Sequence, residues 1–340
     1  MKKIKHNELS NETKSSLKKR VITALVMAAI AFPCIIFGNW VYFAFIVVVT
    51  LLASYELVHV TKIQGKLRIA IYVITIALTL LLVNYILFRN NWSLVKENTP
   101  IDAWEFVANG FDNIELSSML IILAAMIFFV ISFVNEKMTI YYVFYFTTMI
   151  IVLSLGIQSF LYLRYSPFSA WKLADPSYFN LPSFPYFESL LLILYLMIGV
   201  MMNDIGAYFV GILFGKHKMN PRISPKKTWE GFVGGIVIST LFSTLFALIM
   251  ALVHRPILPR FDLSQFYWVV LVSIVMPLAG DIGDFVFSAI KRNEGIKDFS
   301  NLLPGHGGIL DRIDSMLFAS GSIAAMIAFI DFISPIIETI

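Results

Sequence analysis

Long apolar runs separated by short polar connectors dominate this chain. A helix that crosses a membrane needs about 20 mostly apolar residues. Runs of roughly that length cover residues 21–38, 40–58, 69–88, 118–134, 139–162, 189–214, 232–253, 266–290 and 309–333. The pattern predicts an all-α, polytopic transmembrane protein with about nine spans.

The composition agrees with that prediction. The chain is 58% hydrophobic and 14% charged, whereas a soluble domain is about half apolar and about a quarter charged. Its single cysteine, Cys34, lies inside the first apolar run, which excludes an intrachain disulfide and a cysteine cluster for a metal. No small-residue cleavage site follows that run, so we expect a retained first span rather than a cleaved signal peptide.

Polar segments divide the chain into parts. We predict a cytoplasmic basic tail at residues 1–20, an N-terminal transmembrane scaffold of about five spans at 21–163, an extracytoplasmic loop at 164–187 and a C-terminal catalytic region of about four spans at 188–340. The scaffold carries little polar chemistry at depth. Its main exception is Glu56, near the end of the second run, which we interpret as a side chain that reaches back to the interface.

Lysine and arginine indicate the orientation. If the N-terminus is cytoplasmic, 20 of the 26 basic residues lie in cytoplasmic segments and 6 on the other side. Loops that stay in the cytoplasm carry an excess of Lys and Arg. We therefore predict a cytoplasmic N-terminus. This orientation also places both basic loops of the second half, which carry Lys216 to Lys227 and Lys291 to Arg312, on the cytoplasmic face.

The densest polar chemistry lies between the last two apolar runs. Asp281 and Asp284 are three residues apart, so they share one face of a helix, and Ser288 extends that face by a turn. Asp311 and Asp314 repeat the spacing at the start of the next run. A buried network of ion pairs that only joins two helices is the structural alternative, but such networks contribute little to stability compared with apolar packing.

These carboxylates suit a divalent cation. Mg²⁺ takes oxygen ligands, often one or two carboxylates together with substrate phosphates. We predict Mg²⁺ as the cofactor, with a second cation left open, and the metal ligands would be Asp281, Asp284, Asp311 and Asp314. Cations around a polyphosphate are what phosphoryl or nucleotidyl transfer requires. The catalytic candidates are Lys226, Lys227, Lys291, Arg292, Lys297, His306 and Arg312.

A second polar region begins earlier, where Asn203 and Asp204 interrupt an apolar run. A carboxylate at that depth is costly unless it is paired or functional. Gly206 and its neighbouring small residues would let another helix approach closely. A basic loop follows, and neither a P-loop nor a dinucleotide-binding glycine motif is present. The substrate-binding candidates are Asn203, Asp204, Ser224, Thr228, Ser288, Gly307 and Gly308.

The motif around these residues resembles that of a known family. The chain reads S-A-I-K-R at 288–292, K-D-F-S at 297–300 and L-P-G-H-G-G-I-L-D-R-I-D at 303–314. This series is similar to the pattern of the phosphatidate cytidylyltransferases, also called CDP-diacylglycerol synthases. Blocks at 203–208 and 224–231 are similar to further family blocks. The resemblance covers residues 199–315 closely and the first five spans only through hydropathy.

The resemblance implies a reaction and its setting. CTP and phosphatidate would give CDP-diacylglycerol and pyrophosphate with Mg²⁺, in phospholipid biosynthesis. The lipid phosphate would attack the α-phosphorus of CTP, with the metal mainly on Asp284 and Asp311. We further predict a multi-pass protein of the cell inner or plasma membrane with its active site on the cytoplasmic face and no nucleic-acid partner, and the resemblance implies a homodimer.

Other functions fit parts of the same pattern. A CTP-dependent polyprenol or dolichol-type lipid kinase would transfer the γ-phosphate and release CDP. An ion-coupled transporter would also carry intramembrane charge, although the polar clusters lie in one half and form no clear inverted repeat. In a non-catalytic scaffold the aspartates would be replaceable. The identity of the product separates these functions.

Overall fold

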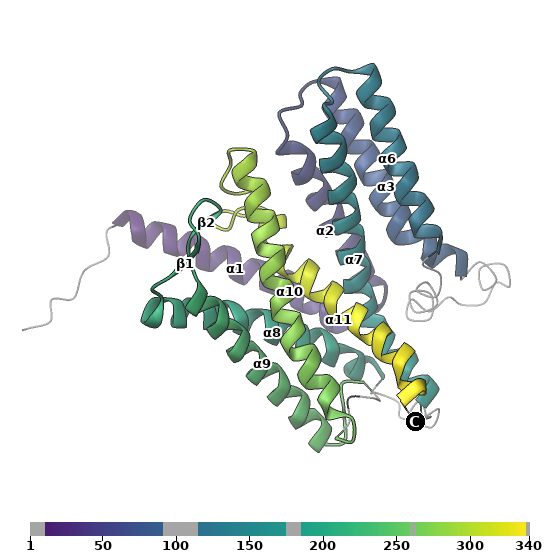
Figure 1. The fold of residues 1–340 in the computed structure, drawn as a ribbon, viewed down its shortest axis with the longest axis vertical. Coiled ribbons are helices and arrows are strands. Elements are labelled where there is room, and N and C mark those ends of the chain that lie inside the picture. The colour runs from purple at the N-terminus through teal and green to yellow at the C-terminus, as the bar shows by residue number, and fades with distance from the viewer. Residues whose placement is uncertain (1–10, 91–114, 175–184, 259–260, 262, 338–340) are drawn as a thin grey trace, which may run out of the picture.

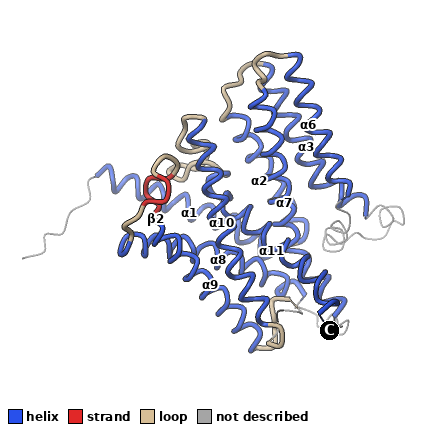
Figure 2. Tube along the Cα trace, in the orientation of Figure 1, coloured by secondary structure: helices blue, strands red, loops and turns tan. Residues whose placement is uncertain are grey.

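The computed structural model describes residues 11–90, 115–174, 185–258, 261 and 263–337, and within them the fold is helical (Figure 1). The helices are α1 (Asn11–Phe37), α2 (Asn39–His59), α3 (Lys66–Asn90), α6 (Glu115–Val134), α7 (Ile140–Ala174), α8 (Pro185–Phe214), α9 (Trp229–Leu252), α10 (Phe266–Asn293) and α11 (Leu310–Ile337). Two short strands, β1 (Lys218–Asn220) and β2 (Ser224–Thr228), form an antiparallel hairpin between α8 and α9 (Figure 2).

The all-α polytopic prediction is confirmed. Among the described residues, 8 helices are long and apolar enough to cross a membrane. The remaining predicted run, 118–134, corresponds to α6, whose described apolar part, Ile121–Val134, is shorter than a full span. The outward faces of these helices expose large apolar side chains such as Phe133, Phe144 and Leu245, as lipid-facing surfaces do.

Figure 1 shows how the helices group. Helices α2, α3, α6 and α7 stand together as one bundle, while α8, α9 and α10 form a second. Helix α11 lies between the two groups and packs against both α10 and α7. This arrangement brings the N-terminal end of α11 next to residues from both halves of the chain.

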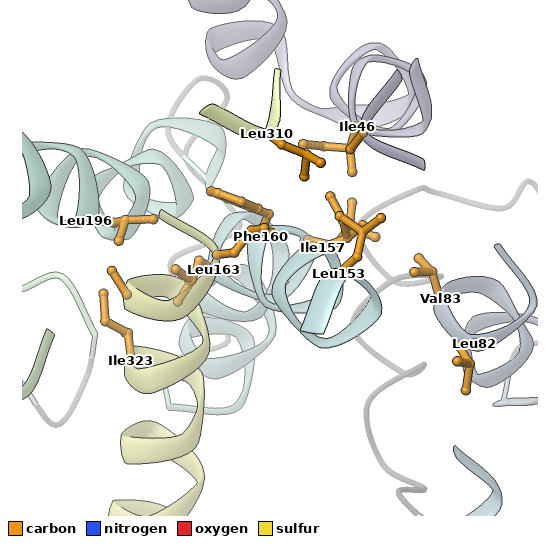
Figure 3. Close-up of a cluster of buried hydrophobic side chains, with 14 of the residues drawn as sticks. Ile46, Leu82, Val83, Leu153, Ile157, Phe160, Leu163, Leu196, Leu310 and Ile323 are labelled. Carbon is orange, nitrogen blue, oxygen red and sulfur yellow. The ribbon is translucent and has the colours of Figure 1, made fainter. Parts of the chain in front are cut away.

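A continuous apolar core joins the two groups (Figure 3). Helix α7 supplies Ile157 and Leu163, which are fully buried, and α11 supplies Ile323. Leu310, the first residue of α11, is also fully buried and lies at the end of the cluster near Ile46 of α2. The core therefore fixes α11 against the N-terminal bundle at the point where the polar motif begins.

Helices extend into two of the predicted polar segments. Helix α1 begins at Asn11, so the second half of the predicted tail is helical, and residues 1–10 lie outside the described part. The predicted loop at 164–187 is largely helix, because α7 continues to Ala174 and α8 begins at Pro185. Of that loop, residues 175–184 lie outside the description.

Arg164 explains why hydropathy misplaced the end of α7. The side chain is fully buried, with Nε 3.0 Å from the Ile35 carbonyl and Nη2 3.4 Å from that of Ile36. These carbonyls belong to the last turn of α1, where a cation is favourable because the helix dipole places negative charge there. A buried arginine paired with a helix end was therefore misinterpreted as a loop charge.

Helices α8 and α9 pack closely through small residues, as the glycines of the sequence predicted. A Cβ on Gly206 would lie 3.1 Å from the Cα of Gly235. Ser239 of α9 also donates to the Gly199 carbonyl of α8 at 2.7 Å. The close packing holds the Asn203–Asp204 pair of α8 beside the start of α9.

Candidate active site

Lys227, at the end of β2, meets the two aspartates of α10. Its Nζ lies 2.5 Å from Oδ2 of Asp284 and 3.4 Å from Oδ1 of Asp281. The predicted shared face of Asp281 and Asp284 is therefore correct. Burial alone would lower the pKa of Lys227, but the two carboxylates outweigh it, so the pKa is raised above its ordinary value. Lys227 thus stays a cation at neutral pH.

A second lysine pairs with the next helix. Lys291, near the end of α10, places Nζ 2.7 Å from Oδ1 of Asp311, and their side chains are 9% and 4% exposed. The other oxygen of Asp311 accepts hydrogen bonds from the backbone N–H of Phe299 at 2.8 Å and of Gly308 at 2.9 Å. Both oxygens of Asp311 are thus engaged by protein donors.

The loop before α11 folds tightly around Asp311. Leu303 N–H donates to the Gly307 carbonyl at 2.9 Å, and His306 N–H donates to the Leu303 carbonyl at 2.8 Å. Gly305 and Gly307 have φ values of 77° and 82°, a left-handed conformation that glycine adopts without a Cβ clash. The glycines around His306 are therefore required by the turn itself.

Asp314 lies one turn into α11, the helix that packs against the α10 helix of Asp284. Its side chain is buried, and Asp284 is the charged side chain that acts on it most strongly. Close packing of α10 and α11 makes this possible, since a Cβ on Gly283 would lie 2.7 Å from the Asp314 carbonyl oxygen. Two carboxylates from different helices thus lie close enough for their like charges to repel.

A cavity of about 480 Å³ opens beside these charges. Its lining includes the charged side chains Asp204, Asp281, Lys218, Lys226 and Lys227. The lining also includes the apolar residues Ala207, Ile212, Met219 and Phe232, together with Tyr208 and Gly211. A molecule with an anionic head and an apolar body fits this mixed lining.

The β1–β2 hairpin places its lysines over the cavity. Thr228 caps α9 by accepting from Gly231 N–H at 3.2 Å. Glu230 ties down the start of the hairpin through His217, whose Nδ1 lies 2.6 Å from Oε1, and through the backbone N–H of Lys216 at 3.1 Å. Ser224, a predicted substrate ligand, pairs with Asn220 in the hairpin register. Thr228 and Ser224 therefore shape the hairpin that carries Lys226 and Lys227.

The other predicted residues lie around this centre. Ser288 donates to Oδ1 of Asp284 at 3.3 Å, as the helix spacing predicted. Arg292 donates to the carbonyls of Ile223 and Ile296, which joins the hairpin to the end of α10. Arg312 donates to the His306 carbonyl at 3.0 Å. These contacts fix the two basic loops relative to each other.

Three predicted residues have side-chain atoms without a protein partner in the described part of the chain. Lys297 is exposed and makes no ion pair there. The buried Nδ1 of His306 and the buried Oδ1 of Asn203 have no hydrogen-bond partner there either. Lys297 is thus free to meet a ligand, whereas the unpartnered His306 Nδ1 is buried and Asn203 Oδ1 packs against Gly235.

The prediction for Glu56 was wrong. Its side chain is fully buried, and it accepts hydrogen bonds from Ser300 and from two amides at the start of α11. The sequence signal was present, because a carboxylate in an apolar run is costly unless it is partnered or functional. The partners lie about 250 positions away in the chain, as the separations of 244 to 254 show, so no local pattern could identify them.

The donor set fits Mg²⁺ on two observations. The buried Oδ2 of Asp281 has no hydrogen-bond partner within the described residues, and the like charges of Asp284 and Asp314 repel where α10 packs on α11. No three His, Cys, Asp or Glu side chains of the described chain lie together as a complete metal cage. That agrees with Mg²⁺, which usually takes one or two carboxylates and completes its shell with water and substrate phosphates.

Comparison with known proteins gives one family. Residues 18–330 match the model of the cytidylyltransferase family. A phosphatidate cytidylyltransferase of Staphylococcus haemolyticus is 32% identical over 310 residues, which cover 89% of this chain and 95% of that protein. Proteins of the same name from Mycobacterium leprae and Staphylococcus aureus are 45% and 43% identical over 123 and 132 residues, which cover 36% and 46% of their lengths.

Proposed function

Because this chain belongs to the cytidylyltransferase family, we propose that it transfers the cytidylyl group of CTP to phosphatidate, giving CDP-diacylglycerol and pyrophosphate. The observation that carries the proposal is the cavity at the hairpin, whose lining combines lysines and carboxylates with apolar side chains. The charged groups suit the phosphates of both substrates. The apolar side chains suit the glycerol and acyl portion of a lipid.

The reaction requires positioning and charge neutralisation more than a side-chain nucleophile. A phosphate oxygen of the lipid forms a bond to the α-phosphorus of CTP, and the bond from that phosphorus to the α–β bridging oxygen breaks. Pyrophosphate leaves with the bonding electron pair. Lys226 and Lys227 would hold phosphate oxygens at the cavity, where their charge counts most as negative charge shifts to the leaving group.

We propose that Mg²⁺ binds one or two of the carboxylates Asp281, Asp284 and Asp314, with water and substrate phosphates completing its shell. When bound, the ion supplies a Lewis acid that neutralises charge on phosphate oxygens. Asp311 is assigned a different part from the one the sequence predicted, because Lys291 and two backbone amides already engage its carboxylate. It would organise the loop that carries His306 beside the substrates.

We further propose that the protein lies in a bacterial plasma membrane and that its site is on the cytoplasmic face. The segments that were assigned to the cytoplasm because they are rich in Lys and Arg lie at one end of the molecule. Thr23 donates to the Pro304 carbonyl at 2.9 Å, and Tyr141 donates to Glu294 at 2.8 Å. An excess of Lys and Arg at that end supports the cytoplasmic assignment. The homodimer stays a prediction, which the mass of the protein–detergent complex would test.

Product analysis tests the reaction. Purified protein in detergent micelles receives phosphatidate, Mg²⁺ and CTP labelled at the α-phosphate. We expect label in the lipid fraction together with equimolar pyrophosphate. Label recovered in water-soluble CDP would indicate a lipid kinase instead. Label that stays in CTP would contradict the assignment of phosphatidate as substrate.

A further inference from the structure

Glu56 links the N-terminal bundle to the start of the helix that carries Asp311 and Asp314. It is fully buried in α2. Its Oε1 accepts from Ser300 Oγ at 2.7 Å and from Ile309 N–H at 2.9 Å, while Oε2 accepts from Leu310 N–H at 2.8 Å. All three donors belong to the loop and the first turn before Asp311.

The contact uses the free amides of a helix N-terminus. The first N–H groups of a helix have no intrahelical acceptor, and a carboxylate there is favoured by both hydrogen bonding and the helix dipole. Such caps normally come from a residue just before the helix. Here the cap of α11 comes from another half of the chain, so its position depends on how α2 packs.

Two carboxylates clamp the same short segment from opposite sides. Asp311 binds Gly308 N–H from within the loop, and Glu56 binds the next two amides from α2. Gly308 lies between them, and its lack of a side chain matters because a Cβ there would meet the Glu56 carboxylate. The side chain of Leu310 is meanwhile buried in the core near Ile46.

We propose that Glu56 is a positioning residue for the cytidylyl transfer, which sets the height and rotation of the first turn of α11 and thereby places Asp314 opposite Asp284. This inference rests on the proposed function. It assigns an indirect, positioning part in the reaction to a span that the sequence identified only as scaffold. Glu56 contacts no reacting atom in this assignment and acts through the backbone of α11.

The test compares Glu56→Gln with wild type in detergent. Glutamine keeps the volume but turns one oxygen into a donor, so at least one amide of the α11 terminus faces another donor. We expect kcat to fall about 10- to 100-fold, since a displacement of about 1 Å at a reacting centre has an effect of that size. The KM values for CTP and phosphatidate should change less than about twofold, because Lys226 and Lys227 lie on the hairpin and not on α11.

Hydrogen exchange supplies a readout that does not depend on activity. In Glu56→Gln the amides of Ile309 and Leu310 should exchange faster than in wild type. Ser300→Ala, which removes one donor without altering α2, should give a smaller effect in the same direction. Ser54→Ala is the matched control, because Ser54 is fully buried in α2 and its hydroxyl has no partner in the described part of the chain. It should leave kcat and both exchange rates unchanged.

An unchanged kcat in Glu56→Gln would overturn the inference. This holds whether the folded variant is as stable as wild type or has a lower thermal stability with unchanged kcat per folded molecule. If Glu56→Gln does not fold, Ser300→Ala decides, and unaltered exchange in that variant would count against the inference. A wild-type protein without transferase activity would instead overturn the proposed function, and exchange at Ile309 and Leu310 would still show whether Glu56 holds this terminus.

Discussion

Replacing Lys227 by Met separates the two roles that the structure gives this side chain. Lys227 neutralises two carboxylates of α10, with Nζ 2.5 Å from Asp284 and 3.4 Å from Asp281. The same ammonium group lines the cavity where the phosphates of both substrates would bind. Methionine keeps most of the length and removes the charge, so stability and turnover should both fall, for different reasons.

The expected losses follow from burial and geometry. Removing one partner of a fully buried ion pair costs about 3–5 kcal/mol. Lys227 and Asp284 are 29% and 30% exposed and Asp281 is 8% exposed, so solvent screens part of the effect and we expect about 2 kcal/mol. Removing one positioned charge-stabilising group typically lowers kcat by about 10²- to 10³-fold.

A second substitution distinguishes the two losses. In Lys227→Met the buried Asp281 carboxylate is left without its cation, so adding Asp281→Asn should recover more than half of the lost stability. Turnover should stay at the level of the single variant or below it. Lys216→Met, in the same loop but with an exposed side chain outside the cavity, is the matched control and should stay within about twofold of wild type.

The assays are thermal unfolding in detergent and transfer of labelled cytidylyl to lipid. The reasoning would be refuted by a folded Lys227→Met protein that keeps more than a tenth of wild-type kcat. Recovery of turnover in the double variant would also refute it, because the lysine would then act only by offsetting Asp281. Equal losses in Lys216→Met would show that any charge of the loop matters, whatever its position.

Three further predictions use the same site. Asp284→Asn should abolish turnover while the protein remains folded and inserted, and a nearly normal rate would contradict the assignment of Asp284 to the metal. Chelation of divalent cations should abolish transfer and Mg²⁺ should restore it, whereas full activity in a chelator would contradict the Mg²⁺ assignment. The pKa of Lys227 is raised above its ordinary value of 10.5, so its ion pairs stabilise the fold below that pH and the contribution is lost only as pH rises through the raised pKa. The difference in unfolding free energy between wild type and Lys227→Met should therefore be constant between about pH 8 and 9.5, and a steady decline across that range would contradict the raised pKa.

Local pattern alone predicted part of the geometry of the candidate site. The spacing of Asp281, Asp284 and Ser288 placed them on one helix face, and the structure joins Ser288 to Asp284 by a hydrogen bond. Hydropathy likewise located most of the membrane helices. Such predictions succeed because helix periodicity and the length needed to cross a membrane are properties of consecutive residues. The end of α7 was misplaced because a charge such as Arg164 can be buried when a distant helix end accepts its hydrogen bonds.

What the sequence determined by itself was the class of protein, its helices, and the residue types that gather around its phosphate chemistry. Tertiary structure alone decided which groups meet. It paired Lys227 with Asp281 and Asp284, gave Lys291 to Asp311, and brought Glu56 to the start of α11. The physical reason is that hydrogen bonds and ion pairs depend on distances of a few ångströms. Such distances between residues far apart in the chain are set by how whole helices pack, which no local periodicity encodes.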